Sequence, residues 1–325
     1  MRAVVCKELG PVENLVFESN WPDPVPGKGE VVVDVKSGSV NFPDVLMIQG
    51  KYQFSAEPPF VPGSELAGVI SAVGEGVSGY AVGDRVIARS GTGAFGEKAK
   101  AKVEQLTKVP EGVDFDTAAT FMVTYGTTHH ALIDRAQLKP GETLLVLGAA
   151  GGVGMAAVEL GKMLGAKVIA AASTDEKLAV CREHGADATI NYSTEDLRKK
   201  LAELTGGKGP DVIYDPVGGS FAEPAFRSIA WRGRYLVIGF ANGEIPKLPL
   251  NLALLKGASI VGVFYGSFAQ REPAEGQKVI DELMDWVRTG KIKPLVSARY
   301  KLEDTVQALQ DMSSRKVTGK IVIVP

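Results

Sequence analysis

Cysteine and histidine, which most often hold disulfides and metal ions in proteins, are scarce in this sequence. Its 325 residues include only two cysteines, Cys6 and Cys181, and three histidines. The two cysteines lie far apart, and neither belongs to a Cys-x-x-Cys pair. This pattern excludes a disulfide framework and argues against a structural zinc site.

Charge of one sign and long apolar runs are also lacking. The formal net charge is −2, whereas nucleic-acid-binding domains usually carry a basic excess. No apolar run approaches the roughly 18 residues that a membrane-spanning helix needs. Residues 1–8 contain neither the apolar stretch nor the small-residue cleavage site of a signal peptide. We therefore expect a cytoplasmic protein that binds neither nucleic acid nor membranes.

The sequence does contain a clear change of pattern near residue 124. Before it, short β-branched runs at 29–35, 66–74 and 83–88 alternate with turn residues, which is typical of a β-rich, barrel-like domain. After it, apolar strands alternate with helical segments, which indicates a parallel sheet covered on both faces. The six expected strands of that sheet are residues 143–147, 167–171, 188–191, 212–214, 235–238 and 259–263.

The last part of the chain shows a third pattern. Residues 278–287 and 304–312 have helical periodicity, and the chain closes with an apolar strand. No further strand–helix unit is completed there, so we expect this tail to pack on the first domain. The expected organisation is a β-rich domain of residues 1–123 and 268–325, with an α/β domain of residues 124–267 inserted into it.

The strongest local signal is the glycine-rich segment Gly148 to Gly154, which follows an expected strand and opens a helix. In a dinucleotide-binding turn of this kind, backbone N–H groups at the helix start face a pyrophosphate. Gly151, Gly152 and Val153 would supply those groups, because no side chain blocks the approach. Ala149 stands at the first glycine position, so the match is imperfect. A glycine-rich turn by itself can also be only a tight turn.

The residues after the second α/β strand bear on the choice between NADH and NADPH. An acidic residue at this place would bond the ribose hydroxyls of NADH, but the sequence has Ser173 there. Ser173 and Lys177 offer the hydroxyl and the cation that a 2′-phosphate favours. Alternatively, Ser173 only caps the next helix in a capping box with Glu176, and Lys177 is solvated. Asp175 and Glu176 count against NADPH, but we predict it as the cofactor.

Taken together, these segments resemble the zeta-crystallin-type quinone oxidoreductases, a zinc-free branch of the medium-chain dehydrogenase/reductase superfamily. The resemblance runs essentially from end to end. It implies a GroES-like barrel domain that carries an inserted Rossmann domain with a doubly wound, six-stranded parallel sheet. The motifs that carry it are Asn41-Phe42-Pro43-Asp44, Gly50-Lys51-Tyr52, Pro62 to Gly68, Gly83 to Val86, Ala149 to Gly154, Gly185-Ala186-Asp187 and Ile190-Asn191-Tyr192.

The resemblance also implies which residues contact the cofactor. Lys177 and Tyr192, with Ser173, would contact the 2′-phosphate of NADPH. Other residues would lie along the rest of the cofactor or near it, namely Thr127, Phe240, Phe264 and Arg315.

The zinc-dependent branch of the superfamily has a cysteine where Asn41 stands and a histidine where Ser64 stands. Amide and hydroxyl groups are poor zinc ligands beside thiolate and imidazole. We therefore expect no alcohol dehydrogenation through a metal, and instead the reduction of an activated acceptor. Quinones are the leading class, and an enoyl or 2-alkenal double bond is the alternative.

Two side chains are candidates for the chemistry itself. Tyr52 is the candidate proton donor, because a phenol with a pKa near 10 stays protonated at neutral pH. Asn41 could donate an amide N–H to the nicotinamide or the substrate. The alternative interpretation makes Tyr52 a half-buried aromatic residue at the mouth of the barrel. We expect no catalytic role for His129 and His130, which lie in a helical segment between the domains.

Two further questions concern partners. A non-catalytic NADPH-binding protein is a different class of function, since zeta-crystallins serve as lens proteins. RNA binding, reported for some relatives, is disfavoured by the nearly neutral charge.

The strand at 259–263 is expected at an edge of the sheet, where an unpaired strand invites pairing. Related enzymes dimerise by joining such edges, so we expect a homodimer.

Overall fold

The computed structural model describes residues 1–325, which form two compact units. The first unit contains residues 1–123 and 293–325, and the second contains residues 124–292. The chain enters the second unit at the position expected from the sequence. It returns later than expected, because residues 268–292, which we had placed in the first unit, belong to the second.

The first unit is built on a seven-stranded sheet in the order β14-β15-β3-β4-β5-β7, with β6 paired to β3. All its neighbours are antiparallel except β14 and β15. A separate hairpin is formed by β1 (Ala3–Val5) and β2 (Val16–Glu18). The strands of the large sheet are β3 (Glu30–Ser39), β4 (Glu65–Val73), β5 (Arg85–Ala88), β6 (Lys98–Lys102), β7 (Leu106–Lys108), β14 (Val296–Lys301) and β15 (Lys320–Val324).

Strand β3 positions the polar residues of the first unit. It is ten residues long, and its end lies between β4 on one side and β15 on the other. Ser39 pairs with Glu65 of β4 and with Val322 of β15. The helices of the unit are α1 (Phe42–Ile48), α2 (Phe115–Thr120) and α11 (Thr305–Ser313), together with 3₁₀ turns at Val12–Asn14, Val103–Gln105 and Leu302–Asp304.

The second unit contains a six-stranded parallel sheet in the order β10-β9-β8-β11-β12-β13. This confirms the predicted doubly wound sheet with six strands. The central strands are apolar and fully buried, as a sheet covered on both faces requires. The strands are β8 (Thr143–Leu147), β9 (Lys167–Ala172), β10 (Ala188–Asn191), β11 (Val212–Asp215), β12 (Arg234–Val237) and β13 (Ser259–Gly262).

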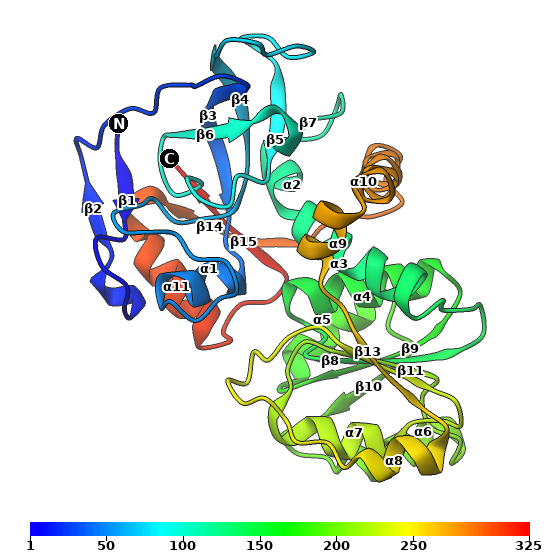
Figure 1. The fold of residues 1–325 in the computed structure, drawn as a ribbon. Helices are drawn as coiled ribbons and strands as arrows, with labels where there is room; N and C mark the ends of the chain where they lie inside the picture. Colours follow the sequence, from blue (N-terminus) through cyan, green and yellow to red (C-terminus); the bar gives the residue numbers. More distant parts are fainter. The chain divides into compact units, whose positions relative to one another are not determined.

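Helices cover both faces of this sheet, with α4 and α5 on one face and α6, α7 and α8 on the other (Figure 1). None of the helices combines the length and the apolar composition that a membrane crossing requires. The helices are α3 (Met122–His129, continued as a π-helix over His130–Arg135), α4 (Gly152–Met163), α5 (Asp175–Glu183), α6 (Leu197–Thr205), α7 (Ala222–Ser228), α8 (Leu250–Lys256), α9 (Tyr265–Arg271) and α10 (Pro273–Arg288), with a 3₁₀ turn at Gly219–Phe221.

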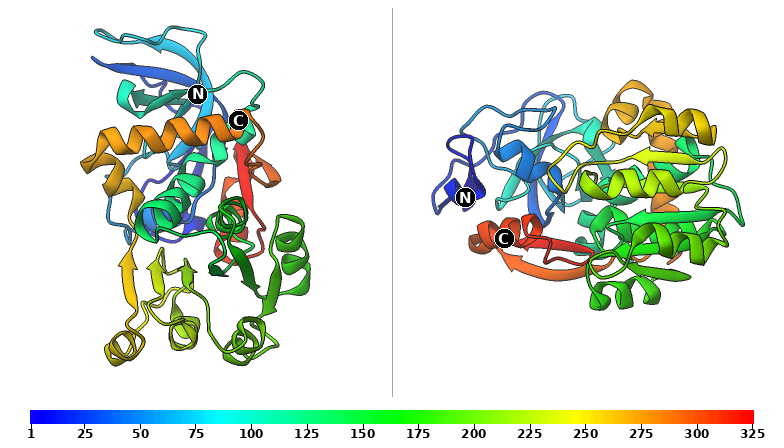
Figure 2. Two further views of the ribbon diagram at one scale, coloured as in Figure 1. Left: turned by 90° about the vertical axis from the view of Figure 1, so that its right-hand side faces the viewer. Right: turned by 90° about the horizontal axis from the view of Figure 1, so that it is seen from below.

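Helix α10, the long orange helix in Figure 2, explains why the second unit extends beyond residue 267. Its apolar stripe faces the end of α3. The Trp286 ring lies 5.5 Å from the His129 ring, and Glu282 Oε2 lies 2.7 Å from His129 Nε2. Helical periodicity predicted the apolar face correctly, but it does not say which surface that face covers.

Candidate active site

The turn between β8 and α4 has the form of a phosphate cradle. Gly151 is the N-cap of α4, and a Cβ added there would meet only Gly148 O, at 3.4 Å. The N–H groups of Gly152 and Val153 belong to the first turn of the helix, where no intrahelical acceptor exists. Gly154 has a different reason to be glycine, because its Cβ would lie 2.3 Å from Gly148 O. The turn therefore leaves room for a pyrophosphate and packs closely below it.

The ends of β9 and β10 bring three predicted residues to one edge of the sheet. Asn191 pairs with Ala172, so Tyr192 and Ser173 follow neighbouring strand ends. The Tyr192 ring packs on Phe221, with 4.3 Å between the ring centroids. We call Gly151, Gly152, Val153, Ser173, Lys177 and Tyr192 the phosphate edge.

Lys177 follows in the first turn of α5, whose N-cap differs from the predicted one. Thr174 caps the helix, and its Oγ1 accepts Lys177 N at 3.3 Å. The predicted capping box of Ser173 with Glu176 is therefore wrong by one residue. The error has a physical cause, since serine and threonine are both good caps and stand next to each other here. Ser173 is left outside the cap.

The other predicted cofactor residues lie in several parts of the fold. Thr127 is half-buried in α3, and Phe264 is 43 % exposed at the start of α9. Phe240 lines an apolar hollow of about 250 Å³ at the ends of β11 and β12. Arg315 belongs to the first unit, where it adopts a left-handed backbone with φ of 57°.

The first unit contains a group of buried polar side chains at the end of β3. None of them is more than 4 % exposed. Proteins bury such groups only with partners, because an unpaired polar group loses its hydration. We call this group the Asn41 cluster, and it consists of Ser39, Asn41, Asp44, Glu65 and Lys320.

Every polar group of the Asn41 side chain has a partner within this cluster. Lys320 Nζ donates to Asn41 Oδ1 at 2.6 Å and to Val40 O at 2.8 Å. Asn41 Nδ2 donates to Glu65 Oε2 at 3.2 Å and to Ser39 Oγ at 3.3 Å. Both amide hydrogens, one of which we expected to reach the nicotinamide or the substrate, are therefore directed at protein oxygens. Donation outside the cluster would have to share one of these two long hydrogen bonds.

The remaining acceptors of the cluster bind backbone N–H groups. Asp44 Oδ2 accepts Asn41 N at 2.7 Å and Asp44 Oδ1 accepts Ser64 N at 3.1 Å, while Glu65 Oε1 accepts Val123 N at 2.9 Å. Burial nevertheless raises the pKa of Asp44 to about 6. Burial also lowers the pKa of Lys320, and the nearby carboxylates of Glu65 and Asp44 oppose that change.

Tyr52 lies in the same unit and is half-buried against its apolar core. Its hydroxyl has no hydrogen-bond partner within the protein, and its ring meets Phe54 edge-on with 6.0 Å between centroids. Burial raises the pKa of Tyr52, and the charge of Asp44 raises it further. The phenol therefore keeps its proton at neutral pH.

The sequence alone assigned no role to two residues of the Asn41 cluster, Glu65 and Lys320. Glu65 was part of a recognised motif but had no role, and Lys320 was treated only as the start of an apolar strand. The sequence contains a signal in both cases, which is a charged residue within an otherwise apolar strand. Such a residue is almost never buried unless it is paired, so each position indicates a buried charged partner.

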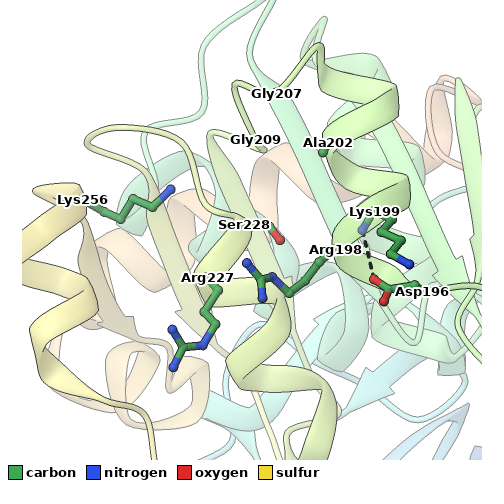
Figure 3. Close-up of a pocket in the computed structure, with 9 residues that line it drawn as sticks. All are labelled: Asp196, Arg198, Lys199, Ala202, Gly207, Gly209, Arg227, Ser228 and Lys256. Carbon is green, nitrogen blue, oxygen red and sulfur yellow. Dashed lines mark hydrogen bonds between the residues drawn. The ribbon is translucent and has the colours of Figure 1, made fainter.

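A second hollow of the second unit is lined by none of the predicted site residues. It has a volume of about 470 Å³ and lies beside α6 and α7 (Figure 3). Its one carboxylate, Asp196, caps α6 by accepting Lys199 N at 3.0 Å. Arg227 donates to Glu223 Oε1 at 2.8 Å, and Arg198 and Lys256 complete the basic lining. We assign no ligand to this basic surface.

Comparison with family models agrees with this architecture. Residues 27–111 match the family described as "Alcohol dehydrogenase GroES-like domain", and residues 152–286 match "Zinc-binding dehydrogenase". A GroES-like domain joined in one chain to a Rossmann-type unit with a phosphate cradle defines the class of the medium-chain dehydrogenases/reductases.

Individual relatives narrow the class. The chain is 40% identical to the quinone oxidoreductase-like protein 2 homolog of Nematostella vectensis, over 99% of this chain and 88% of that protein. It is 36% identical to the quinone oxidoreductase of Pseudomonas aeruginosa, over 92% of each chain. The Escherichia coli quinone oxidoreductase, solved in complex with NADPH, matches with a TM-score of 0.93 and 29% identity over the full length of both chains. The chain belongs to the quinone oxidoreductase family.

One matched family is described as zinc-binding, so we asked whether the residues around Asn41 could bind a zinc ion. Zinc sites in proteins use thiolate, imidazole and carboxylate ligands. The residues at the two positions expected for ligands are Asn41 and Ser64, and Lys320 places an ammonium group 2.6 Å from the Asn41 oxygen. No group of three or more His, Cys, Asp or Glu residues in the chain could hold a metal ion. These residues do not fit a zinc ion.

Proposed function

We propose that this protein is an NADPH-dependent oxidoreductase that reduces quinones by hydride transfer without zinc. The observation that carries the proposal is the phosphate edge, which combines an open helix N-terminus with a hydroxyl, a cation and a phenol at the adjoining strand ends. Two solved relatives support it, because the Escherichia coli quinone oxidoreductase and a mycobacterial protein that is 33% identical were both solved with NADPH.

The preference for NADPH over NADH follows from the end of β9. No carboxylate stands at Ser173, where one would bond the ribose hydroxyls of NADH and repel a 2′-phosphate. Asp175 and Glu176 count against NADPH, but Asp175 Oδ1 accepts Asn191 Nδ2 at 2.9 Å. This hydrogen bond holds the Asp175 carboxylate against β10. Lys177 is then the charged group that we propose to bind the 2′-phosphate of NADPH.

In the proposed reaction NADPH supplies the hydride when it is bound, and the residues of the chain supply orientation and protons. Tyr52 holds a proton at its Oη and can pass it to an anionic product, because its raised pKa keeps the phenol neutral. Its hydroxyl is not used in the fold, so no internal hydrogen bond has to break. Asn41 would orient the nicotinamide or the substrate through an amide hydrogen that it shares with Glu65 or Ser39.

A second candidate activity is the reduction of enoyl or 2-alkenal double bonds. The free hydroxyl of Tyr52 favours it, since reduction of an alkene leaves a carbon that must be protonated. A quinone product can take its proton from water. The two activities therefore differ in how strongly they need a positioned proton donor.

We also propose that the protein is a homodimer joined at strand β13. This strand is the last of the six-stranded sheet, and its backbone is paired only with β12. Exposed edges and exposed apolar patches are typical of association surfaces. Large apolar side chains are exposed on β13 itself, on helix α8 just before it, and just before β12: Ile260, Leu250, Leu254, Leu255 and Trp231. Leu254 is 80 % exposed. We expect the variant Leu254→Asp to sediment as a monomer. If this variant remains a dimer, the interface lies elsewhere.

The test of the proposed activity is the oxidation of NADPH with a panel of quinones, 2-alkenals and enoyl thioesters, with NADH as the control cofactor. We expect turnover with quinones, a clear preference for NADPH, and no loss after treatment with a chelator. Binding of NADPH without turnover of any acceptor would favour a non-catalytic protein. Stoichiometric zinc in the purified protein, with activity lost on chelation, would refute the zinc-free mechanism.

A further inference from the structure

The Asn41 cluster contains two carboxylic acids and one amine that the first unit buries almost completely. Asp44 and Glu65 are at most 1 % exposed, and Lys320 is 4 % exposed. Burying charges is costly, and buried ion pairs are often no more stabilising than apolar side chains of the same volume. Stability alone therefore does not account for an ammonium group at this position. Buried charged side chains with shifted pKa values cluster at functional sites.

The register of the sheet explains how Lys320 reaches Asn41. Val322 of β15 pairs with Ser39 of β3 in antiparallel fashion, so the chain two residues before Val322 lies opposite the chain two residues after Ser39. Those positions are Lys320 and Asn41. On the other side of β3, Glu65 pairs with Ser39. Asn41 therefore lies between a cation on one neighbouring strand and a carboxylate on the other.

This arrangement determines the orientation of the Asn41 amide. The two ends of an amide have nearly the same shape, but one end only accepts and the other only donates hydrogen bonds. An ammonium group cannot accept, and a carboxylate cannot donate. Only the orientation with Oδ1 toward Lys320 and Nδ2 toward Glu65 satisfies both neighbours. A flipped amide would place its hydrogens against the ammonium and its oxygen against the carboxylate.

We propose that Lys320 is a positioning residue of the active site, whose ammonium group fixes the Asn41 amide and balances the buried carboxylates of Asp44 and Glu65. The inference rests on the proposed function, in which Asn41 orients the reacting groups. Lys320 does not contact the substrate in this scheme and acts through Asn41. The balance of charge also matters for Tyr52, because the charge of Asp44 makes the phenol a weaker acid.

The test compares five variants. Lys320→Met keeps the length of the side chain without its charge, and Lys320→Arg keeps the charge. Asn41→Ala removes the amide, and the double variant combines Lys320→Met with Asn41→Ala. Lys301→Met is the matched control, because Lys301 is an exposed lysine on the neighbouring strand β14. For each variant we would measure kcat with a quinone, the Kd of NADPH and the free energy of unfolding.

We expect Lys320→Met to lower kcat by about 10- to 100-fold, since a misplaced group in an active site can cost about 10²-fold. The Kd of NADPH should change by less than about twofold, because the phosphate edge lies in the other unit. Lys320→Arg should restore part of kcat, and Lys301→Met should retain all of it. The double variant should be no slower than Asn41→Ala alone, because both changes disable the same amide.

A second readout does not depend on activity. The chain has six asparagines, so protein labelled with ¹⁵N-asparagine gives six pairs of side-chain amide signals, and Asn41→Asp identifies one of them. In wild type and Lys320→Arg the Asn41 pair should exchange slowly with solvent. In Lys320→Met it should exchange at least about tenfold faster, because the amide is no longer held in one orientation.

The outcomes separate this inference from the proposed function. If wild-type protein reduces no acceptor, the proposed function fails, and the asparagine signals alone decide whether Lys320 holds the amide. If those signals are the same in Lys320→Met as in wild type, the inference is overturned. The inference is also overturned if Lys320→Met retains full kcat. The same holds if the reductions in kcat caused by Lys320→Met and by Asn41→Ala add up in the double variant.

Discussion

Gly154 offers the sharpest test of how the β8–α4 turn works, through the substitution Gly154→Ala. The added Cβ would lie 2.3 Å from Gly148 O and 2.8 Å from Ala149 Cα. Non-bonded carbon atoms keep about 3.5 Å or more from their neighbours, so the turn must move by roughly 1 Å. Both contacts are backbone atoms, which cannot swing aside as a flexible side chain would.

The cost can be worked out from these contacts. Overpacking of this kind costs about 1–3 kcal/mol, and the higher helix propensity of alanine returns up to about 1 kcal/mol. We therefore expect the free energy of unfolding to fall by about 1–2 kcal/mol. The displaced N–H groups should also weaken NADPH binding by at least about tenfold, which is the effect of losing one hydrogen bond to a charged group.

Gly151→Ala is the matched control in the same turn, because its Cβ would meet only Gly148 O, at an ordinary contact distance of 3.4 Å. Its backbone, with φ of −77° and ψ of 171°, suits alanine. The free energy of unfolding should change by no more than about 1 kcal/mol, the usual effect of a weaker N-cap. NADPH binding should still weaken by at least about tenfold, because the methyl group obstructs the approach of the pyrophosphate.

The assays are urea unfolding followed by circular dichroism, and titration of NADPH fluorescence. Unchanged stability in Gly154→Ala would show that the turn is looser than these distances indicate. Wild-type affinity in Gly151→Ala would mean that no phosphate lies over the start of α4.

Three further predictions concern single side chains. Lys177→Ala should weaken NADPH binding by about 10- to 150-fold and leave NADH nearly unaffected; equal losses in fluorescence titrations would mean that Lys177 does not read the 2′-phosphate. Tyr52→Phe should lower kcat/KM by less than about tenfold with a quinone and by about 10²-fold with any enal accepted; equal small effects would leave Tyr52 a packing residue. Neither cysteine should react with a thiol reagent at pH 8 before unfolding, since both are buried and burial raises the pKa of Cys181 to about 11; rapid labelling of the native protein would contradict this.

The elements of the second unit were the easiest to predict from the sequence. Strands β8 and β10 begin and end at the predicted residues, 143–147 and 188–191, and the other four strands differ by one residue at most at either end. Buried parallel strands are short apolar runs between helices, so their pattern is local and depends little on distant contacts. The resemblance to a family added the GroES-like fold of the first unit, whose strand pairing no local pattern reveals.

Two of the three errors concern features that depend on a partner far away in the chain. The prediction places residues 268–292 in the wrong unit. The sequence of an amphipathic helix shows which face is apolar, but not which surface that face packs on. Thr174 replaced Ser173 as the helix cap because the two are adjacent and chemically alike. The use of both Asn41 hydrogens inside the cluster depends on Glu65 and Ser39, and the orientation of the amide depends on Lys320. The register of three strands brings these residues together. Spacing along the sequence does not contain that register.

The place of β15 in the first sheet has a consequence for how the molecule is made. The second unit is one continuous segment, residues 124–292, so all of it leaves the ribosome before the last strands of the first unit. Strand β15 pairs with β3 across almost the whole sequence, and Lys320 arrives with it. Domains generally fold as units during synthesis. The inserted unit can therefore fold while the first is still incomplete, and the Asn41 cluster is assembled only after residues 1–319 have been synthesised.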